Sequence, residues 1–250
     1  MCLLLLALNR VADRPWLLLG NRDEFHARPT APAQAWPDAP DVLGGRDLQA
    51  AGSWLAVHRG GRFAAVTNVR TTAPKTARRS RGALVGDFVA GAVTASAYVA
   101  DVAARRHEYG PFNLVVGAHD GAWFVSSSDG QPRPLADGVH AFSNGSPADE
   151  WPKMRRLRAR FDVTVAGGSP NDAAFLDLLF DETQPGDDEL PDTGVGLDLE
   201  RRLAPIFIRG ATYGTRASTL AYADRDGRVF LHERRFGPDA TRLGESQLHF

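Results

Sequence analysis

The sequence has very little cysteine, no long apolar run and no excess of charge of either sign. Cys2 is the one cysteine among 250 residues, so the chain cannot form an internal disulfide or a zinc site built from several thiolates. Its 29 Lys and Arg residues balance 30 Asp and Glu residues, which argues against broad electrostatic attraction to nucleic acid or to an anionic membrane. The longest apolar run, Leu3–Leu8, is far shorter than the roughly 20 residues that cross a bilayer, and it lacks the preceding basic residue of a signal peptide. These absences predict a soluble, cytoplasmic protein with no nucleic-acid partner and no membrane span.

What the sequence does contain is a series of short apolar runs joined by turns. Such runs on either side of a glycine-containing turn predict hairpins of antiparallel sheet, because glycine supplies the positive φ of a tight turn. A proline-rich segment, Arg28–Pro40, is predicted to be a surface loop. No repeat or shift in composition divides the chain, so we expect one domain over residues 1–250. The predicted strand pairs are Leu3–Leu8 with Trp16–Leu19, Trp54–Val57 with Phe63–Val66, Asn113–Gly117 with Trp123–Ser126, and Ser218–Ala223 with Val229–Glu233.

Amphipathic segments in the middle and the later half of the chain predict helices. Gly82–Val89 and Thr94–Arg106 are expected as consecutive helices. Glu150–Phe161 is expected as a third, and we assign its basic residues to a solvated helix face rather than to RNA binding. A fourth helix is predicted to begin with Ser169 as N-cap and Pro170 as its first residue. Hairpins together with these helices predict the α+β class.

Cys2 is the most informative residue because it directly follows the initiator Met1. Cysteine is small enough for an aminopeptidase to remove that methionine, which would leave a thiol and a free α-amine on one residue. Their reference pKa values, about 8.5 and 7.7–8.0, lie near neutrality, so the amine can act as the base for its own thiol. The alternative interpretation is a small residue buried at the start of a strand.

Four consecutive polar residues, Asn21-Arg22-Asp23-Glu24, directly follow the predicted strand Trp16–Leu19. Polar groups held at the end of a rigid strand are well placed for catalysis. Arg22 can stabilise a thiolate and lower its pKa, and Asp23 can hold the ammonium group of an N-terminal residue. Alternatively, the segment is an exposed exit from strand to loop.

Three further residues are candidates for the same chemistry. Asn68 ends a predicted strand, and Asn144 follows a short apolar stretch. Asparagine amides and backbone N–H groups are the usual donors to a reaction oxyanion, although Asn144-Gly145 also fits a turn in which the asparagine is left-handed. Arg216, in the glycine-hinged segment Tyr213–Thr219, can grip a carboxylate or orient a nucleophile, unless that segment is an ordinary surface loop.

The seven histidines show no metal-ligand spacing such as H-E-x-x-H, so no metal site is predicted. The sequence also contains no Walker loop, Rossmann fingerprint or G-x-S-x-G motif. Haem needs only one or two axial ligands, and the sequence therefore leaves haem binding open.

Considered together, these motifs resemble the NRDE family, also called transport and Golgi organisation 2-like proteins. The resemblance begins with a cysteine after the initiator methionine and continues in Asn21–Phe25. It extends in the expected order over nearly the whole chain. The further matching blocks are Gly44–Leu48, Gly52–Leu55, Thr67–Arg70, Ser80–Val85, Phe112–Leu114, Ser143-Asn144, Trp151–Lys153, Tyr213–Thr219 and Glu233–Phe236.

The resemblance implies a branch of the N-terminal nucleophile hydrolases, similar to penicillin V acylase and bile-salt hydrolase. Their shared architecture is a four-layer αββα sandwich, in which helices cover the outer faces of two antiparallel sheets packed face to face. In those relatives an N-terminal cysteine attacks an amide carbonyl. The positions implied here are Cys2 as nucleophile with its own α-amine as base, Asn68 and Asn144 as oxyanion donors, and Arg216 as the distal arginine.

One block departs from the hydrolase pattern. The hydrolases have Arg-Asn-x-Asp where this chain has Asn21-Arg22-Asp23-Glu24. Either Asp23 or Glu24 can therefore be the residue that meets the N-terminal amine.

These inferences predict an amide (C–N) hydrolase that uses Cys2 after removal of Met1. It is expected to need no cofactor and to act on a small-molecule amide or acyl substrate, with Arg22 and Asp23 setting the charge state of the thiol and the amine. Some members of the family are linked to intracellular haem handling. The alternative is therefore a carrier of haem or another hydrophobic ligand, built on the same fold and without turnover.

Overall fold

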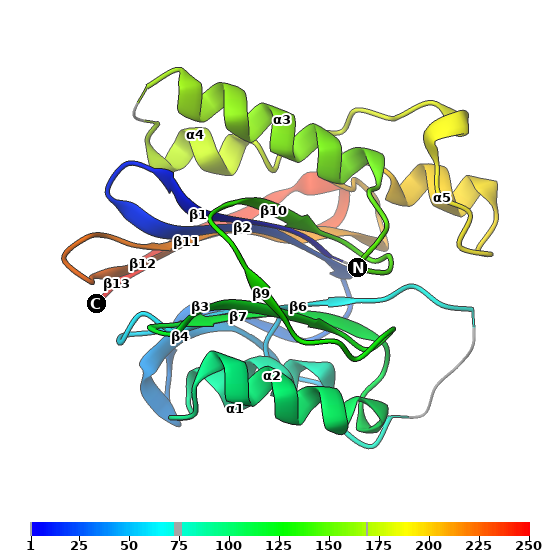
Figure 1. The fold of residues 1–250 in the computed structure, drawn as a ribbon. Coiled ribbons are helices and arrows are strands. Elements are labelled where there is room, and N and C mark those ends of the chain that lie inside the picture. Colours follow the sequence, from blue (N-terminus) through cyan, green and yellow to red (C-terminus); the bar gives the residue numbers. More distant parts are fainter. Residues whose placement is uncertain (1, 73–76, 169) are drawn as a thin grey trace.

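The computed structural model describes residues 2–72, 77–168 and 170–250. Two antiparallel sheets pack face to face, and helices cover both outer faces (Figure 1). This arrangement confirms the predicted four-layer αββα sandwich. The expectation of one domain over the whole chain stays a prediction.

The first sheet has six strands and contains both ends of the described chain (Figure 1). Its two central hairpins confirm the predicted pairing of the first two apolar runs and of the last two, but the strands extend further than the runs do. In spatial order the strands are β10 (Gly138–Phe142), β1 (Cys2–Val11), β2 (Arg14–Phe25), β11 (Tyr213–Ala223), β12 (Val229–Phe236) and β13 (Arg242–His249).

The second sheet has seven strands that follow one another in chain order. Two of its hairpins confirm the pairings predicted from their glycine turns, Leu55–His58 with Phe63–Asn68 and Phe112–Ala118 with Gly121–Ser126. Its strands are β3 (Thr30–Trp36), β4 (Ala39–Asp47), β5 (Leu55–His58), β6 (Phe63–Asn68), β7 (Phe112–Ala118), β8 (Gly121–Ser126) and β9 (Arg133–Leu135).

The predicted surface loop Arg28–Pro40 is wrong, because most of this segment forms β3 and the start of β4. Proline is tolerated here because β3 is the edge strand of its sheet, where a missing N–H breaks no ladder on the outer side. Pro32 also lies where the pairing register shifts, between Ala31 and Gln34.

The first three predicted helices are confirmed, as α1 (Arg81–Val89), α2 (Ala95–Ala104) and α3 (Pro152–Ala166). The fourth, α4 (Asp172–Asp177), is capped by the side chain of Asn171, so Pro170 is not its first residue, and Ser169 lies outside the described residues. Within the described ranges, no helix combines the length and the apolar character needed to cross a bilayer. The remaining helical elements are α5 (Leu197–Leu203) and the 3₁₀ turns η1 (Arg106–Glu108), η2 (Asp187–Glu189) and η3 (Pro238–Ala240).

The core lies in three layers, and the alternation of side chains along β1 shows how they are separated. Leu4 and Leu6 pack between the two sheets, whereas Leu3 and Leu5 pack beneath α3 and α4. Successive side chains of a strand point to opposite faces. An even-numbered residue at the start of β1 therefore faces the second sheet.

A close approach of two backbones fixes the start of α1 against the connection between β4 and β5. A Cβ atom on Gly82 would lie 2.9 Å from the backbone nitrogen of Ser53 and 3.0 Å from the Cα of Gly52. The Ser53 N–H donates to the carbonyl oxygen of Gly82 at 3.2 Å. Only glycine at position 82 permits this contact.

Two glycines in the same helix should therefore respond oppositely to alanine. Gly82→Ala is expected to lower the free energy of unfolding by about 1–3 kcal/mol, because its methyl group meets backbone atoms that cannot rotate away. Gly86→Ala, whose Cβ would lie 3.8 Å from the ring of Trp36, should raise it by about 0.5–1 kcal/mol through helix propensity. Urea unfolding followed by circular dichroism measures both, and a shift of the same sign in both variants would contradict the described approach.

Candidate active site

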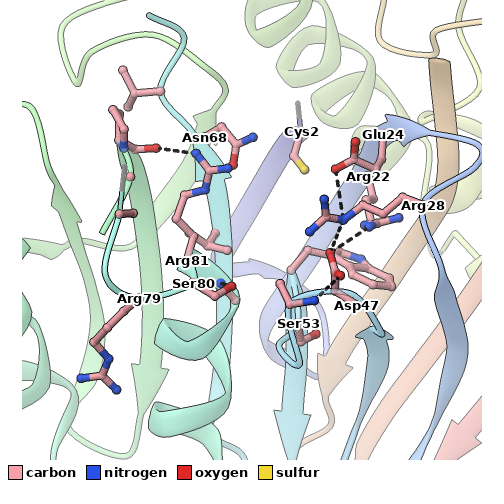
Figure 2. A pocket seen from close by; sticks show the side chains of 18 of the residues that line it. Cys2, Arg22, Glu24, Arg28, Asp47, Ser53, Asn68, Arg79, Ser80 and Arg81 are labelled. Atoms are coloured by element: carbon pink, nitrogen blue, oxygen red, sulfur yellow. Dashed lines mark hydrogen bonds and ion pairs between the residues drawn. The ribbon is translucent and has the colours of Figure 1, made fainter. Parts of the chain in front are cut away.

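A cavity of about 590 Å³ lies where β1 and β2 of the first sheet meet β4 and β6 of the second, and Cys2 is part of its lining. Side chains from both sheets and from the start of α1 complete the walls. Figure 2 shows the Cys2 thiol between two groups of side chains, with Asn68 and Arg81 on one side and Arg22 and Arg28 on the other. A concave site of this size is typical of small-molecule binding.

Cys2 begins β1 and pairs with Arg22 across the β1–β2 ladder. Its thiol points into the space between the sheets, in register with Leu4. The residue is 8% exposed, so it is buried at the start of a strand and also contributes to the wall of a cavity. Burial raises the pKa of the thiol above its ordinary value, and the positive charge of Arg22 opposes that rise. Met1 lies outside the described residues, and its removal stays a prediction.

The polar segment Asn21–Glu24 lies inside β2 and not beyond its end, because the strand continues through the whole segment. The interpretation as an exposed exit from the strand is therefore wrong. Asn21, Arg22 and Asp23 are only 1%, 4% and 2% exposed. Alternation places Arg22 toward the cavity and second sheet, whereas Asn21 and Asp23 face the helices.

Arg22 is held by three different contacts on the cavity side. Its guanidinium donates to the hydroxyl of Thr30 at 3.2 Å and to Asp47 at 3.4 Å. It also lies 4.5 Å from the ring centre of Trp54, a cation–π geometry. Arg28 donates to the same carboxylate, Asp47, at 2.6 Å. The positive charge beside the thiol is thus fixed in position by the second sheet.

Asp23 contributes a buried carboxyl group on the other face of β2. Its Oδ1 accepts a hydrogen bond from the Thr215 hydroxyl at 2.7 Å, and the Tyr213 hydroxyl donates to its backbone carbonyl at 3.2 Å. Burial raises the pKa of this carboxyl, and the charge of Lys153 opposes the rise. Both Asp23 and the half-buried Glu24 line the cavity. Which of the two meets the N-terminal amine stays open.

Lys153 is a buried ammonium group that the sequence analysis placed on a solvated helix face. That prediction is wrong for this residue, which is 3% exposed and donates to the carbonyl oxygen of Leu203 at 3.2 Å. Burial lowers the pKa of Lys153 to about 8, and the charges of Asp23 and Cys2 oppose that effect. The sequence did contain a signal, because Leu157 and Phe161 follow at intervals of four and share one face of α3 with it.

Two of the other basic residues in that run agree with the prediction, whereas Arg158 and Arg160 are half-buried. Arg155 and Arg156 are exposed, and they pair with Glu189 and Asp181 at 2.8 and 2.7 Å. The solvated face therefore begins one turn into α3.

Besides Arg22–Asp47, a second buried ion pair borders the cavity, and the sequence analysis did not predict it. Arg70, in the lining, pairs with Glu200 of α5, with their side chains 7% and 4% exposed. The hydroxyl of Thr193 donates to the same carboxylate at 2.5 Å. Arg70 also lies over the ring of Trp151, 4.8 Å from its centre. These contacts connect the segment after β6 to both α3 and α5.

The two predicted oxyanion donors are brought together. The Asn144 side-chain amide donates to the backbone carbonyl of Asn68 at 2.8 Å. Of the described residues that line the cavity, Asn68 is one and Asn144, which is fully buried, is not. Asn144 does not adopt the left-handed conformation of the competing turn interpretation. It holds the end of β6 in this structure, and the oxyanion roles of both residues stay predictions.

Arg216 lies behind the cavity wall. Its Nη1 donates to the Thr30 hydroxyl at 3.1 Å and to the carbonyl oxygens of Phe25 and Arg28. Of the described residues lining the Cys2 cavity, Arg216 is not one. Its guanidinium donates to the same Thr30 hydroxyl as Arg22 does. Arg216 is therefore linked through Thr30 to Arg22, the residue opposite Cys2 in the β1–β2 ladder.

Residues 2–72, 77–168 and 170–250 contain no group of three or more His, Cys, Asp or Glu side chains that could hold a metal ion. A second cavity of about 620 Å³ adjoins the first, sharing Asn68 and Glu24 with it. Among the described histidines, none lines either cavity.

Known proteins resemble this chain in sequence and in fold. Residues 1–238 match the family described as Transport and Golgi organisation 2. The Transport and Golgi organization protein 2 homologs of Bos taurus and Homo sapiens are 32% and 30% identical, covering 90% and 87% of this chain and 88% and 85% of theirs. The crystal structure of the C2A mutant of conjugated bile acid hydrolase from Clostridium perfringens has a TM-score of 0.52 at 9% identity, covering 99% of this chain and 92% of that one. The fold is therefore that of the N-terminal nucleophile hydrolases.

Burial of Lys153 should make stability depend on alkaline pH. Between its folded pKa of about 8 and the value of about 10.4 for an exposed lysine, the unfolded chain binds more protons than the folded protein. The free energy of unfolding of the wild type is therefore expected to rise, relative to Lys153→Met, by up to about 3 kcal/mol between pH 8 and 10.5. Urea unfolding in steps of pH measures this difference. Arg155→Met, at an exposed position, should run parallel to the wild type, and a Lys153→Met curve that also runs parallel would contradict the effect.

Proposed function

The chain belongs to the Transport and Golgi organisation 2 family, and from this premise we propose that it is an amide hydrolase of the N-terminal cysteine class. One observation carries the proposal. The only cysteine of the sequence lies on the wall of a 590 Å³ cavity, in a fold similar to that of a protein named as a hydrolase. A small-molecule amide or acyl compound that enters this cavity meets the thiol directly.

The first half of the reaction needs the α-amine that removal of Met1 exposes. Because burial raises the pKa of the Cys2 thiol, the thiol needs a base beside it, and the freed amine takes its proton. The thiolate then adds to the carbonyl carbon and forms a tetrahedral oxyanion. Collapse of this intermediate breaks the C–N bond, the ammonium proton passes to the leaving amine, and a thioester remains on Cys2.

The second half returns the enzyme to its starting state. The α-amine deprotonates a water molecule, which attacks the thioester carbonyl. The C–S bond breaks, a carboxylic acid leaves, and the thiol is restored. No cofactor takes part in this sequence of steps.

The surrounding residues have separate roles in the proposal. Arg22 and Asp23 set the charge state of the thiol and the amine from opposite faces of β2. The Asn68 backbone and the Asn144 side chain are the proposed oxyanion donors. Because the Asn144 amide already donates to the Asn68 carbonyl, this role requires its second amide hydrogen to reach the cavity. Arg216 positions the Thr30 hydroxyl against Arg22.

The alternative, a carrier of haem or another hydrophobic ligand, makes a different demand on the same cavity. Because no described histidine lines it, a haem bound there would take Cys2 as its protein ligand. A carrier of this kind would hold haem through Cys2 without any hydrolysis at the thiol. The two functions therefore differ in whether an acyl group leaves Cys2 after it has been transferred.

Turnover of an activated acyl donor distinguishes these functions. Purified wild type is expected to release more than one p-nitrophenolate per chain from p-nitrophenyl acetate, with an acetyl group on Cys2 visible by intact mass. Cys2→Ala, which removes the only thiol, should lose at least about 100-fold in this rate, because the nucleophile is gone. Only chains without Met1 should be acetylated.

Cys2→Ser is the matched variant, since it keeps a nucleophilic oxygen of lower reactivity and should retain slow acetylation. Stoichiometric acetylation without further release would favour the carrier. Equal turnover by the wild type and Cys2→Ala would refute the hydrolase proposal.

A further inference from the structure

The Cys2 cavity carries an uneven distribution of charge. Its lining contains three carboxylates and twice as many guanidinium groups. Charged side chains that line a cavity usually occur as pairs, because an uncompensated charge is costly away from water. The cationic residues of the lining are Arg22, Arg28, Arg70, Arg78, Arg79 and Arg81, and the acidic residues are Asp23, Glu24 and Asp47.

On the wall formed by β2 and β4, the charges compensate one another. Asp47 accepts from Arg28 at 2.6 Å and from Arg22 at 3.4 Å. Glu24 lies 3.8 Å from Arg28. Each guanidinium on this wall therefore already has a carboxylate partner within the protein.

On the opposite wall, most arginines are engaged elsewhere. Arg79 points away from the cavity (Figure 2) and pairs with Asp87 at 2.8 Å. Arg70 pairs with Glu200. Arg78 is exposed, where water screens its charge.

Arg81 differs from all of these. It is half-buried, and its one hydrogen bond within the described chain runs from Nη1 to the carbonyl oxygen of Pro111 at 3.3 Å. It forms no ion pair with any described carboxylate. Arg81 lines the same cavity as Cys2, and Figure 2 shows it on the Asn68 side of the thiol. A guanidinium is always charged in proteins, and its remaining donors match the geometry of a carboxylate or phosphate.

We propose that Arg81 is an anion-binding subsite in the cavity of the nucleophile, which selects substrates that carry a carboxylate or phosphate group in addition to the scissile carbonyl. This inference rests on the proposed function and names a substrate class for it. The anion completes the pairing that Arg81 lacks, and it brings the carbonyl between Cys2 and Asn68. Arg81 is thus a specificity-determining residue.

A different role for Arg81 would be to stabilise the Cys2 thiolate. The two roles separate experimentally, because a thiolate-stabilising charge speeds every alkylating reagent, whereas a subsite favours the anionic one. Iodoacetate and iodoacetamide are matched reagents, since both give a C–S bond at Cys2 with release of iodide and differ only in charge.

The experiment measures the alkylation rates of Cys2 with both reagents at one pH and ionic strength. Relative to free cysteine, the wild type should favour iodoacetate over iodoacetamide, and Arg81→Gln should lower this rate ratio about tenfold. Arg81→Lys should lose part of the preference, because an ammonium lacks the planar fork. Arg79→Gln, which removes a cavity arginine already paired outside, should keep the full ratio. Protection of the wild type by acetate or by inorganic phosphate shows which anion the subsite prefers.

Each outcome decides the proposal independently of turnover. A preference for iodoacetate that depends on Arg81 supports the subsite even if p-nitrophenyl acetate is not turned over, in which case only the hydrolase proposal fails. Equal slowing of both reagents in Arg81→Gln would overturn the subsite in favour of thiolate stabilisation. A wild-type ratio equal to that of free cysteine, or a thiol that reacts with neither reagent, would also overturn it.

Discussion

In the β1–β2 ladder Cys2 lies opposite Arg22, and the alternation of apolar residues along β1 keeps it there. Leu3 and Leu5 fill the helix side of this strand while Leu4 and Leu6 fill the space between the sheets. If the strand slipped by one residue, the leucines of the helix side and those between the sheets would exchange places, and the thiol would turn toward α3. The position of the nucleophile thus depends on the same hydrophobic packing that stabilises the sandwich.

The same strand pair brings several charges into the protein interior, and each requires a partner. Arg22 is compensated by Asp47, and Arg70 by Glu200. Lys153 lies behind the site with its ammonium on a backbone carbonyl. Replacing such groups by apolar side chains often stabilises a protein. Their presence around one thiol, at a cost in stability, is typical of a site arranged for chemistry.

Local patterns in the sequence predicted the hairpins and the α+β class, and the family resemblance implied the four-layer sandwich. The long-range pairings could not be predicted. Glycine turns and apolar runs indicate hairpins because both act over a few residues. The Pro-rich segment was misassigned because the tolerance of β3 for proline depends on its place at a sheet edge, which only the complete topology reveals. The resemblance implies Asn144 and Arg216 as site residues, and those roles stay predictions. Their hydrogen-bond partners, Asn68 and Thr30, follow only from the three-dimensional contacts. Arg81 is recognisable only once the partners of its neighbouring arginines are known.

In the proposed hydrolase a thiol and an α-amine on one residue carry out all the chemistry, and this arrangement exists only if the mature chain begins at Cys2. Intact-mass spectrometry of the protein isolated from its own host tests this claim most directly. We expect a mass lower than that of the full sequence by one methionine residue, with Cys2 read as the first residue by N-terminal sequencing. Quantitative retention of Met1 would leave the thiol without its base and would contradict the account.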